Sequence, residues 1–167
     1  MKYLIDSNSL ITPARLYYSF DFACSFWEQL KDNIENEKII ILDSVYNEIN
    51  KSDDELSSWI KSINKDLILK KNDEIVLKYS EIINYINTCG LYKSSAFSDW
   101  ARFDVADPWL IAAAVVNQYE IVTFEVHDFN LNEKTPSKKI KIPNICDVFG
   151  VKYIKLFEMM RNLEIQL

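Results

Sequence analysis

Glycine, proline, cysteine and histidine are all scarce in this sequence, and each scarcity excludes a class of protein. The 167 residues include only 2 Gly, 4 Pro, 3 Cys and 1 His, whereas aromatic residues make up 13%. Few Gly and Pro beside many aromatic side chains exclude a disordered or low-complexity chain. The cysteines, Cys24, Cys89 and Cys146, form no CxxC or Cys/His pattern, which argues against a zinc site and a disulfide framework. We therefore expect reduced thiols, and we assign no role to the lone His127.

Long apolar runs are also missing. No stretch approaches the roughly 20 apolar residues that a membrane-spanning helix needs. The first residues, Met1 to Asp6, lack the apolar region of a signal peptide. The sequence therefore predicts a cytoplasmic protein without a membrane partner.

Positive charge is in deficit, with 19 Lys and Arg against 25 Asp and Glu and a net charge of −6. Phosphate binding normally needs surplus Lys and Arg, so this balance argues against a large non-specific DNA-binding protein. It argues only weakly against an enzyme that grips a few phosphates, because carboxylates clustered on a divalent cation are neutralised there. The short basic stretch Lys138 to Lys141 is usually a solvated strand face, and phosphate contact is the less common interpretation.

Apolar residues are plentiful at 49% of the chain, enough for a hydrophobic core and for a single domain over residues 1–167. Apolar and β-branched runs predict strands near residues 2–5, 39–42, 119–123, 139–142 and 151–154. Helical patterns fall between them, including one over residues 104–118. Strands that alternate with helices predict an α/β fold, with a central parallel sheet of four or five strands covered on both faces.

Four acidic residues lie at or near the predicted strand ends, where ligand sites of such folds are found. Asp6 ends the first strand, and Glu48 lies one helical turn beyond the end of the second. Asp107 starts the helix that leads into the third strand, and Glu125 follows that strand. Carboxylate oxygens are the ligands that Mg²⁺ prefers, and one or two such ions can activate water for phosphodiester hydrolysis. We therefore expect Mg²⁺ or Mn²⁺ on these four acids. Asp104 could share the helical face of Asp107 and serve as a further ligand, or it could face solvent in the preceding turn.

Each acid also has a structural interpretation when taken alone. Asp6 could cap the first helix, and Asp107, which precedes Pro108, could cap a later one. Glu48 and Glu125 are ordinary surface residues by local sequence, so the signal is the joint position of the four at strand ends.

Three polar residues are candidates for substrate binding. Ser7 and Asn8 could hydrogen-bond a phosphate or a water molecule, although helix capping is comparably plausible. Arg102 could hold a phosphate through two parallel hydrogen bonds.

Three segments carry a resemblance to a known family. Residues 3–11 (YLIDSNSLI) resemble the first strand and turn of PIN-domain nucleases, and residues 107–114 (DPWLIAAA) are similar to the family's Asp-x-x-Ile-Ala-x-Ala helix. Residues 121–125 (IVTFE) look like its Val-Thr-x-Asp segment. The resemblance covers nearly the whole chain in order. Residues 141–146 and 156–159 are similar to segments typical of an uncharacterised bacterial PIN-like branch.

The resemblance implies a three-layer α/β/α sandwich and a metal-dependent endoribonuclease, often the toxin of a bacterial toxin–antitoxin pair. RNA would be the substrate, a cognate antitoxin the partner, and a homodimer is a further expected assembly. By position, Asp6, Glu48, Asp107 and Glu125 correspond to the family's acidic quartet. Two departures stand out: Glu125 replaces the usual Asp, and the segment between Lys51 and Trp100 is longer than in compact members.

Two alternatives stay open at this point. One is a phosphatase or a structure-specific DNA nuclease on the same scaffold. The other is a catalytically inactive PIN-like binding module.

Overall fold

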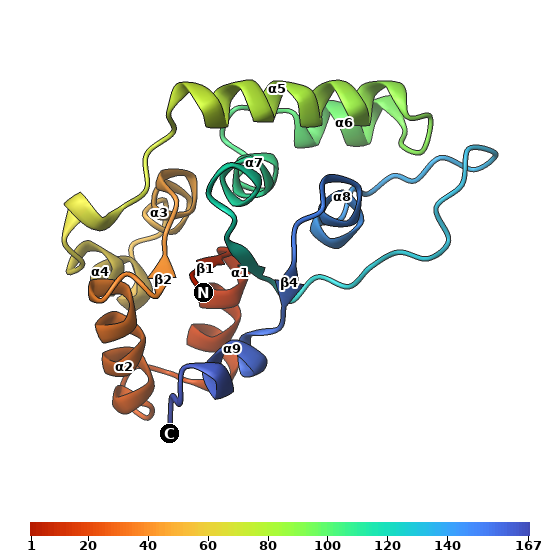
Figure 1. Ribbon diagram of the computed structural model, residues 1–167. Helices are drawn as coiled ribbons and strands as arrows, with labels where there is room; N and C mark the ends of the chain where they lie inside the picture. The colour runs from red at the N-terminus through yellow and green to blue at the C-terminus, as the bar shows by residue number, and fades with distance from the viewer.

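A four-stranded parallel sheet lies at the centre of the computed structural model, which describes all 167 residues (Figure 1). The strands are β1 (Tyr3–Ile5), β2 (Ile39–Ile40), β3 (Glu120–Val122) and β4 (Tyr153–Ile154), in the spatial order β2-β1-β3-β4. Leu4 pairs with Ile40 on one side and with Ile121 on the other. Both faces of the sheet are covered, which explains why the strands are continuous apolar runs without alternation. The predicted α/β class with a parallel sheet is confirmed.

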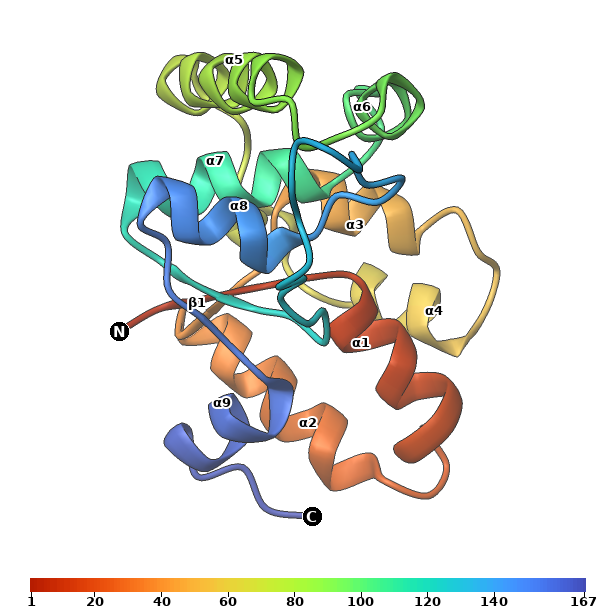
Figure 2. The ribbon, with the colours of Figure 1, turned by 90° about the vertical axis from the view of Figure 1, so that its right-hand side faces the viewer.

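Helices form a layer on each side of the sheet, as Figures 1 and 2 show from two directions. On one face lie α1, the π-helical turn η1, α2 and α9. On the other lie α3, α7 and α8, with α5 and α6 stacked outside α7. The bounds of these elements are α1 (Asn8–Thr12), η1 (Pro13–Tyr17), α2 (Cys24–Glu35), α3 (Asp43–Ile49), α4 (Glu55–Lys61), η2 (Lys65–Leu67), α5 (Asp73–Thr88), α6 (Ser94–Trp100), α7 (Asp107–Asn117), α8 (Ile142–Phe149) and α9 (Leu156–Asn162).

The strand predicted over residues 139–142 is wrong. Residues 138–141 form no strand, and Ile142 begins α8 with Pro143 in its first turn. Proline suits this position because its missing N–H would have no partner at a helix start. The apolar alternation instead reflects Ile140 and Ile142, which are 7% and 1% exposed. The helix predicted from Asp104 also begins later, at Asp107.

Helix α7 is the centre of the core. Its residues from Pro108 to Ala114 are all buried, because the sheet covers one side of the helix and α5 covers the other. The small side chains of Ala112, Ala113 and Ala114 let α7 approach both neighbours closely. No helix in the structure is both long and apolar enough to cross a lipid bilayer.

All four strands run in the same direction, so their carboxyl ends share one edge of the sheet. β1 and β3 are neighbours, and the Asp6 amide donates to the Val122 carbonyl at 3.0 Å just where both strands end. Residues that directly follow β1 and β3 are therefore held side by side, although more than a hundred positions separate them in the chain.

Candidate functional site

Asp6 and Thr123 form the floor of the site, at the ends of β1 and β3. The Thr123 Oγ1 hydroxyl donates to Asp6 Oδ2 at 3.1 Å, and both residues are buried, at 0% and 1% exposure. The Asp6 carboxylate makes no capping bond to α1, whose start has no side-chain cap. The capping interpretation of Asp6 therefore does not hold, and its buried carboxylate needs another explanation.

Glu48 reaches the same place from α3, the helix that follows β2. The Ser7 hydroxyl donates to Glu48 Oε2 at 2.9 Å and lies 3.4 Å from Asp6 Oδ1. Ser7 is only 2% exposed, so its hydroxyl is fixed between two carboxylates that come from different strand ends. This side chain makes no capping hydrogen bond either.

Asp107 enters from the first turn of α7. The Trp100 indole Nε1, at the end of α6, donates to Asp107 Oδ2 at 3.0 Å. Asp107 makes no side-chain cap, although Pro108 follows it as expected at a helix start. The carboxylate is thus oriented by a tryptophan rather than by the helix that it begins.

Glu125 is the most firmly held of the four acids. Its Oε1 atom accepts from Lys141 Nζ at 2.9 Å, and its Oε2 atom accepts from the Ile142 amide at 2.7 Å, at the start of α8. The backbone N–H of Glu125 donates to Thr123 Oγ1 at 3.1 Å. The ammonium of Lys155, directly after β4, donates to the Phe124 carbonyl at 3.0 Å and to the Glu125 carbonyl.

Asp6 is strongly affected by its surroundings. Burial, followed by the negative charge of Asp107, raises the pKa of Asp6 to about 7, with the hydrogen bond from Thr123 opposing. The charges of Glu125 and Glu48 raise the Asp6 pKa further. The other three acids are therefore close enough to act on Asp6.

Asp107 is affected in the same way. Burial and then the charge of Glu125 raise the pKa of Asp107 to about 6, and Glu48 adds to the rise. The hydrogen bond from Trp100 and the positive charge of Lys141 act in the opposite direction. Lys141 is therefore close enough to influence two of the four acids.

The type of donor fits a hard divalent cation. All four groups are carboxylates, the ligands preferred by Mg²⁺ and Mn²⁺. The raised pKa values of Asp6 and Asp107 result first from burial and then from repulsion by neighbouring carboxylates, and a bound cation would compensate for both. The oxygens are not yet gathered into a coordination shell, since no group of three or more His, Cys, Asp or Glu residues is placed to hold an ion. Hydrogen bonds from Ser7, Trp100 and Lys141 hold three of the carboxylates instead.

Asp104, Arg102 and Asn8 lie apart from this cluster. Arg102 Nε donates to Asp104 Oδ1 at 3.1 Å, and Lys51 Nζ lies 3.3 Å from Asp104 Oδ2. These hydrogen bonds lower the pKa of the Asp104 carboxyl, whose side chain is 53% exposed. Asn8 is exposed, and its side chain makes no hydrogen bond within the protein. A metal-binding role for Asp104 and substrate-binding roles for Arg102 and Asn8 stay predictions.

Sequence reasoning gave no role to Thr123, Trp100 or Lys155. Thr123 and Lys155 directly follow β3 and β4, so the rule that selected Asp6 would have selected them had it been applied to residues other than acids. Trp100 is buried, as an aromatic residue is expected to be, but no sequence signal connects its indole N–H with Asp107.

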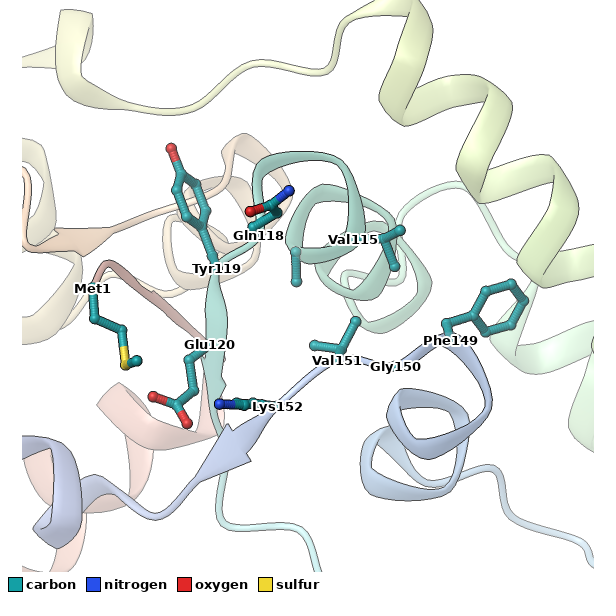
Figure 3. A pocket seen from close by; sticks show the side chains of 10 residues that line it. Met1, Val115, Gln118, Tyr119, Glu120, Phe149, Gly150, Val151 and Lys152 are labelled. Carbon is teal, nitrogen blue, oxygen red and sulfur yellow. The ribbon is translucent and has the colours of Figure 1, made fainter.

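A separate pocket of about 340 Å³ lies at the opposite edge of the sheet, at the amino ends of β3 and β4. Figure 3 shows the side chains of Glu120 and Lys152 next to each other in this pocket, with Tyr119 and Phe149 on opposite sides of it. None of the four clustered acids lines this pocket, so it is not part of the candidate site.

Comparison with known proteins supports the fold. The chain resembles a solved structure titled "Crystal structure of VapBC2 from Rickettsia felis bound to a DNA fragment from their promoter", with a TM-score of 0.53 and 14% sequence identity. The match covers 93% of this chain and 98% of that one. Such low identity shows a shared fold, as expected from the PIN-like prediction, and nothing more. No curated protein matches the chain.

One family model matches the sequence over residues 3–167, which is nearly its whole length. The matched region includes all four strands and every residue of the acid cluster. The chain therefore belongs to the family described as a domain of unknown function (DUF4411).

Proposed function

We propose that the protein is a metal-dependent endoribonuclease whose active site is the cluster of Asp6, Glu48, Asp107 and Glu125. The observation that carries this proposal is the position of these four carboxylates at the carboxyl edge of a PIN-like sheet, where the charges of Glu48 and Glu125 act on Asp6 and Asp107. Burying like charges together destabilises a protein unless a cation compensates for them. A site that keeps this arrangement is a candidate for function.

Asp6 and Asp107 would hold Mg²⁺ or Mn²⁺ directly, and Glu48 and Glu125 directly or through water. When bound, the cation would stabilise negative charge on the phosphoryl oxygens and activate the attacking water. The residues of the chain orient its ligands: Thr123 holds Asp6, Trp100 holds Asp107, and Ser7 holds Glu48. Lys141 and the start of α8 hold Glu125 against the edge of the site.

The same proposal extends to a toxin–antitoxin role. In this extended proposal the protein is a toxin that acts in the cytoplasm as one PIN-like domain and is bound by a cognate antitoxin protein; the fold shared with VapBC2 is what supports the pairing. A homodimer is a further part of this proposal. A gene for a small DNA-binding protein next to the gene for this chain would support the pairing.

Cleavage assays test the proposed activity. Purified protein with millimolar Mg²⁺ or Mn²⁺ is expected to cleave single-stranded RNA, and Asp6→Asn is expected to abolish cleavage while the circular dichroism spectrum stays unchanged. Branched DNA and a small phosphomonoester serve as competing substrates, since preference for either would point to the alternative enzyme classes. Full cleavage by Asp6→Asn would remove this residue from the site. Absence of cleavage, together with no stabilisation by millimolar Mn²⁺, would favour an inactive binding module.

A further inference from the structure

A cleft of about 270 Å³ opens directly beside the acid cluster. One wall is formed by α6, with Ala96, Asp99 and Trp100, and the other is the extended segment Lys138–Lys141. Glu125 contributes to both the cleft and the acid cluster, so the two are continuous. A group bound in the cleft would therefore lie next to one bound among the acids.

The basic wall of the cleft is anchored at both ends. Ser137 pairs with the turn between α5 and α6, where its amide donates to the Leu91 carbonyl at 2.8 Å and its carbonyl accepts from the Lys93 amide at 2.9 Å. Ile140 is buried at 7% exposure, and α8 begins at Ile142. In Figure 2 the connection between β3 and α8 rises from the sheet to the turn between α5 and α6 and then returns to α8, and Lys138–Lys141 belong to the returning part. The backbone that carries the lysines is thus held in place.

The charges in the cleft are unevenly compensated. Lys141 is paired with Glu125, but Lys138 and Lys139 are exposed and make no ion pair anywhere in the structure. The remaining acid in the cleft is Asp99, which is also exposed and unpaired. Lysines therefore outnumber carboxylates here by three to two, although the whole chain carries a net charge of −6.

We infer that this cleft is a phosphate-binding subsite, in which Lys138 and Lys139 hold a phosphate of the nucleic-acid strand that neighbours the bond to be cleaved. The inference rests on the proposed function, because it takes the acid cluster as the place of cleavage. Four carboxylates repel the negatively charged nucleic-acid strand. A nuclease with such an acidic active site therefore needs positively charged side chains nearby to bind the strand. Lys138 and Lys139 are the unpaired ammonium groups in the cleft that adjoins the acids.

Binding of single-stranded RNA in chelator, where no metal-dependent cleavage occurs, tests the subsite. The probe is a fluorescent oligonucleotide of about 12 nucleotides, with DNA of the same sequence as a second arm, and the readout is the dissociation constant at several salt concentrations. Lys138→Ala/Lys139→Ala is expected to weaken binding about tenfold near 0.1 M salt and to reduce the slope of log K against log salt by about 0.7, the value for one lost phosphate contact on a single strand. Asp99→Asn is expected to change affinity in the opposite direction, because it removes a negative charge from the cleft.

The matched control is Lys38→Ala/Lys152→Ala, which removes two exposed lysines that directly precede β2 and β4, at the amino ends of the strands, and is expected to leave affinity and slope unchanged. An equal loss of affinity for RNA and DNA indicates that the subsite recognises the phosphate alone. A loss of affinity confined to RNA indicates that the subsite also contacts the ribose. Either result supports the subsite. An unchanged salt slope in the cleft variant, an equal loss in the control, or no binding by the wild type overturns the subsite. Cleavage of RNA by the wild type with metal is scored separately. If the wild type does not cleave RNA but its binding depends on Lys138 and Lys139, the nuclease proposal is refuted and the phosphate-binding subsite is supported. If the wild type cleaves RNA but the variant binds RNA as tightly as the wild type, the subsite is refuted and the nuclease proposal is supported.

Discussion

Replacing Asp6 by Asn should stabilise the metal-free protein at the expense of its function. Asp6 is 1% exposed and lies beside three other carboxylates, so its ionised form is disfavoured in the folded state. The pKa of this group rises from an ordinary value of 3.8 to about 7. Such a difference corresponds to about 4 kcal/mol of lost stability once the carboxyl is ionised. Asparagine has nearly the same shape and carries no charge to repel Asp107.

The sign of the pH dependence follows from this rise in pKa. Between pH 3.8 and about 7 the folded protein binds a proton at Asp6 that the unfolded chain has released, so wild-type stability falls as pH rises through this range. Asp6→Asn lacks this contribution. We therefore expect the variant to be more stable than the wild type by about 2–4 kcal/mol at pH 8, and to be no more stable near pH 4.

Urea unfolding in the presence of a chelator, followed by the fluorescence of the four tryptophans, measures both quantities. Asp53→Asn is the matched control, because Asp53 is exposed and its replacement should alter stability little at any pH. Millimolar Mn²⁺ should then stabilise the wild type and leave Asp6→Asn almost unaffected. The reasoning is refuted if Asp6→Asn is no more stable than the wild type at pH 8, or if its stability falls between pH 4 and pH 7 as steeply as that of the wild type.

Substitutions at three further positions test the charge balance, the packing and the backbone, each by urea unfolding at pH 8. Lys141→Met should cost about 1 kcal/mol, because it removes the ammonium that pairs with the partly buried Glu125, while Lys141→Arg should retain most of that stability. Ala113→Leu should cost about 1–3 kcal/mol, because position 113 is fully buried in α7 and has no room for a longer side chain. Gly150→Ala should cost about 1 kcal/mol through the backbone alone, because Gly150 has a φ of +69° and no atom within 4 Å of an added Cβ. An unchanged unfolding midpoint in Lys141→Met, Ala113→Leu or Gly150→Ala would contradict the corresponding argument.

Much of the fold was predictable because its signals are local. The run Tyr3–Ile5 is apolar and ends in a polar turn, and residues 107–114 combine a helix-starting proline with an alanine-rich stretch. The segment Lys139–Ile142 misled because two buried isoleucines spaced two apart have the period of a strand. The same spacing arises wherever an extended segment enters a helix, and only the position of Pro143 distinguishes the two cases.

The candidate site was predictable in its acids but not in the groups that hold them. Asp6, Glu48, Asp107 and Glu125 were identified because a parallel sheet brings strand ends to one edge. Pairing of Glu125 with Lys141, and of Asp107 with Trp100, depends on the loops before α7 and α8. Those loops have no periodic pattern, so nothing in the sequence indicates where their side chains point.

The sequence by itself determined the class of fold and which carboxylates follow the strands, since apolar periodicity and residue type are properties of single segments and single residues. Tertiary structure alone decided that the charges of Asp107, Glu125 and Glu48 act on Asp6, that Lys141 pairs with Glu125, and that Lys138 and Lys139 are left unpaired beside that pair. The physical reason is that electrostatic interaction depends on distance through space and on burial. Neither quantity exists for a chain until its core has packed.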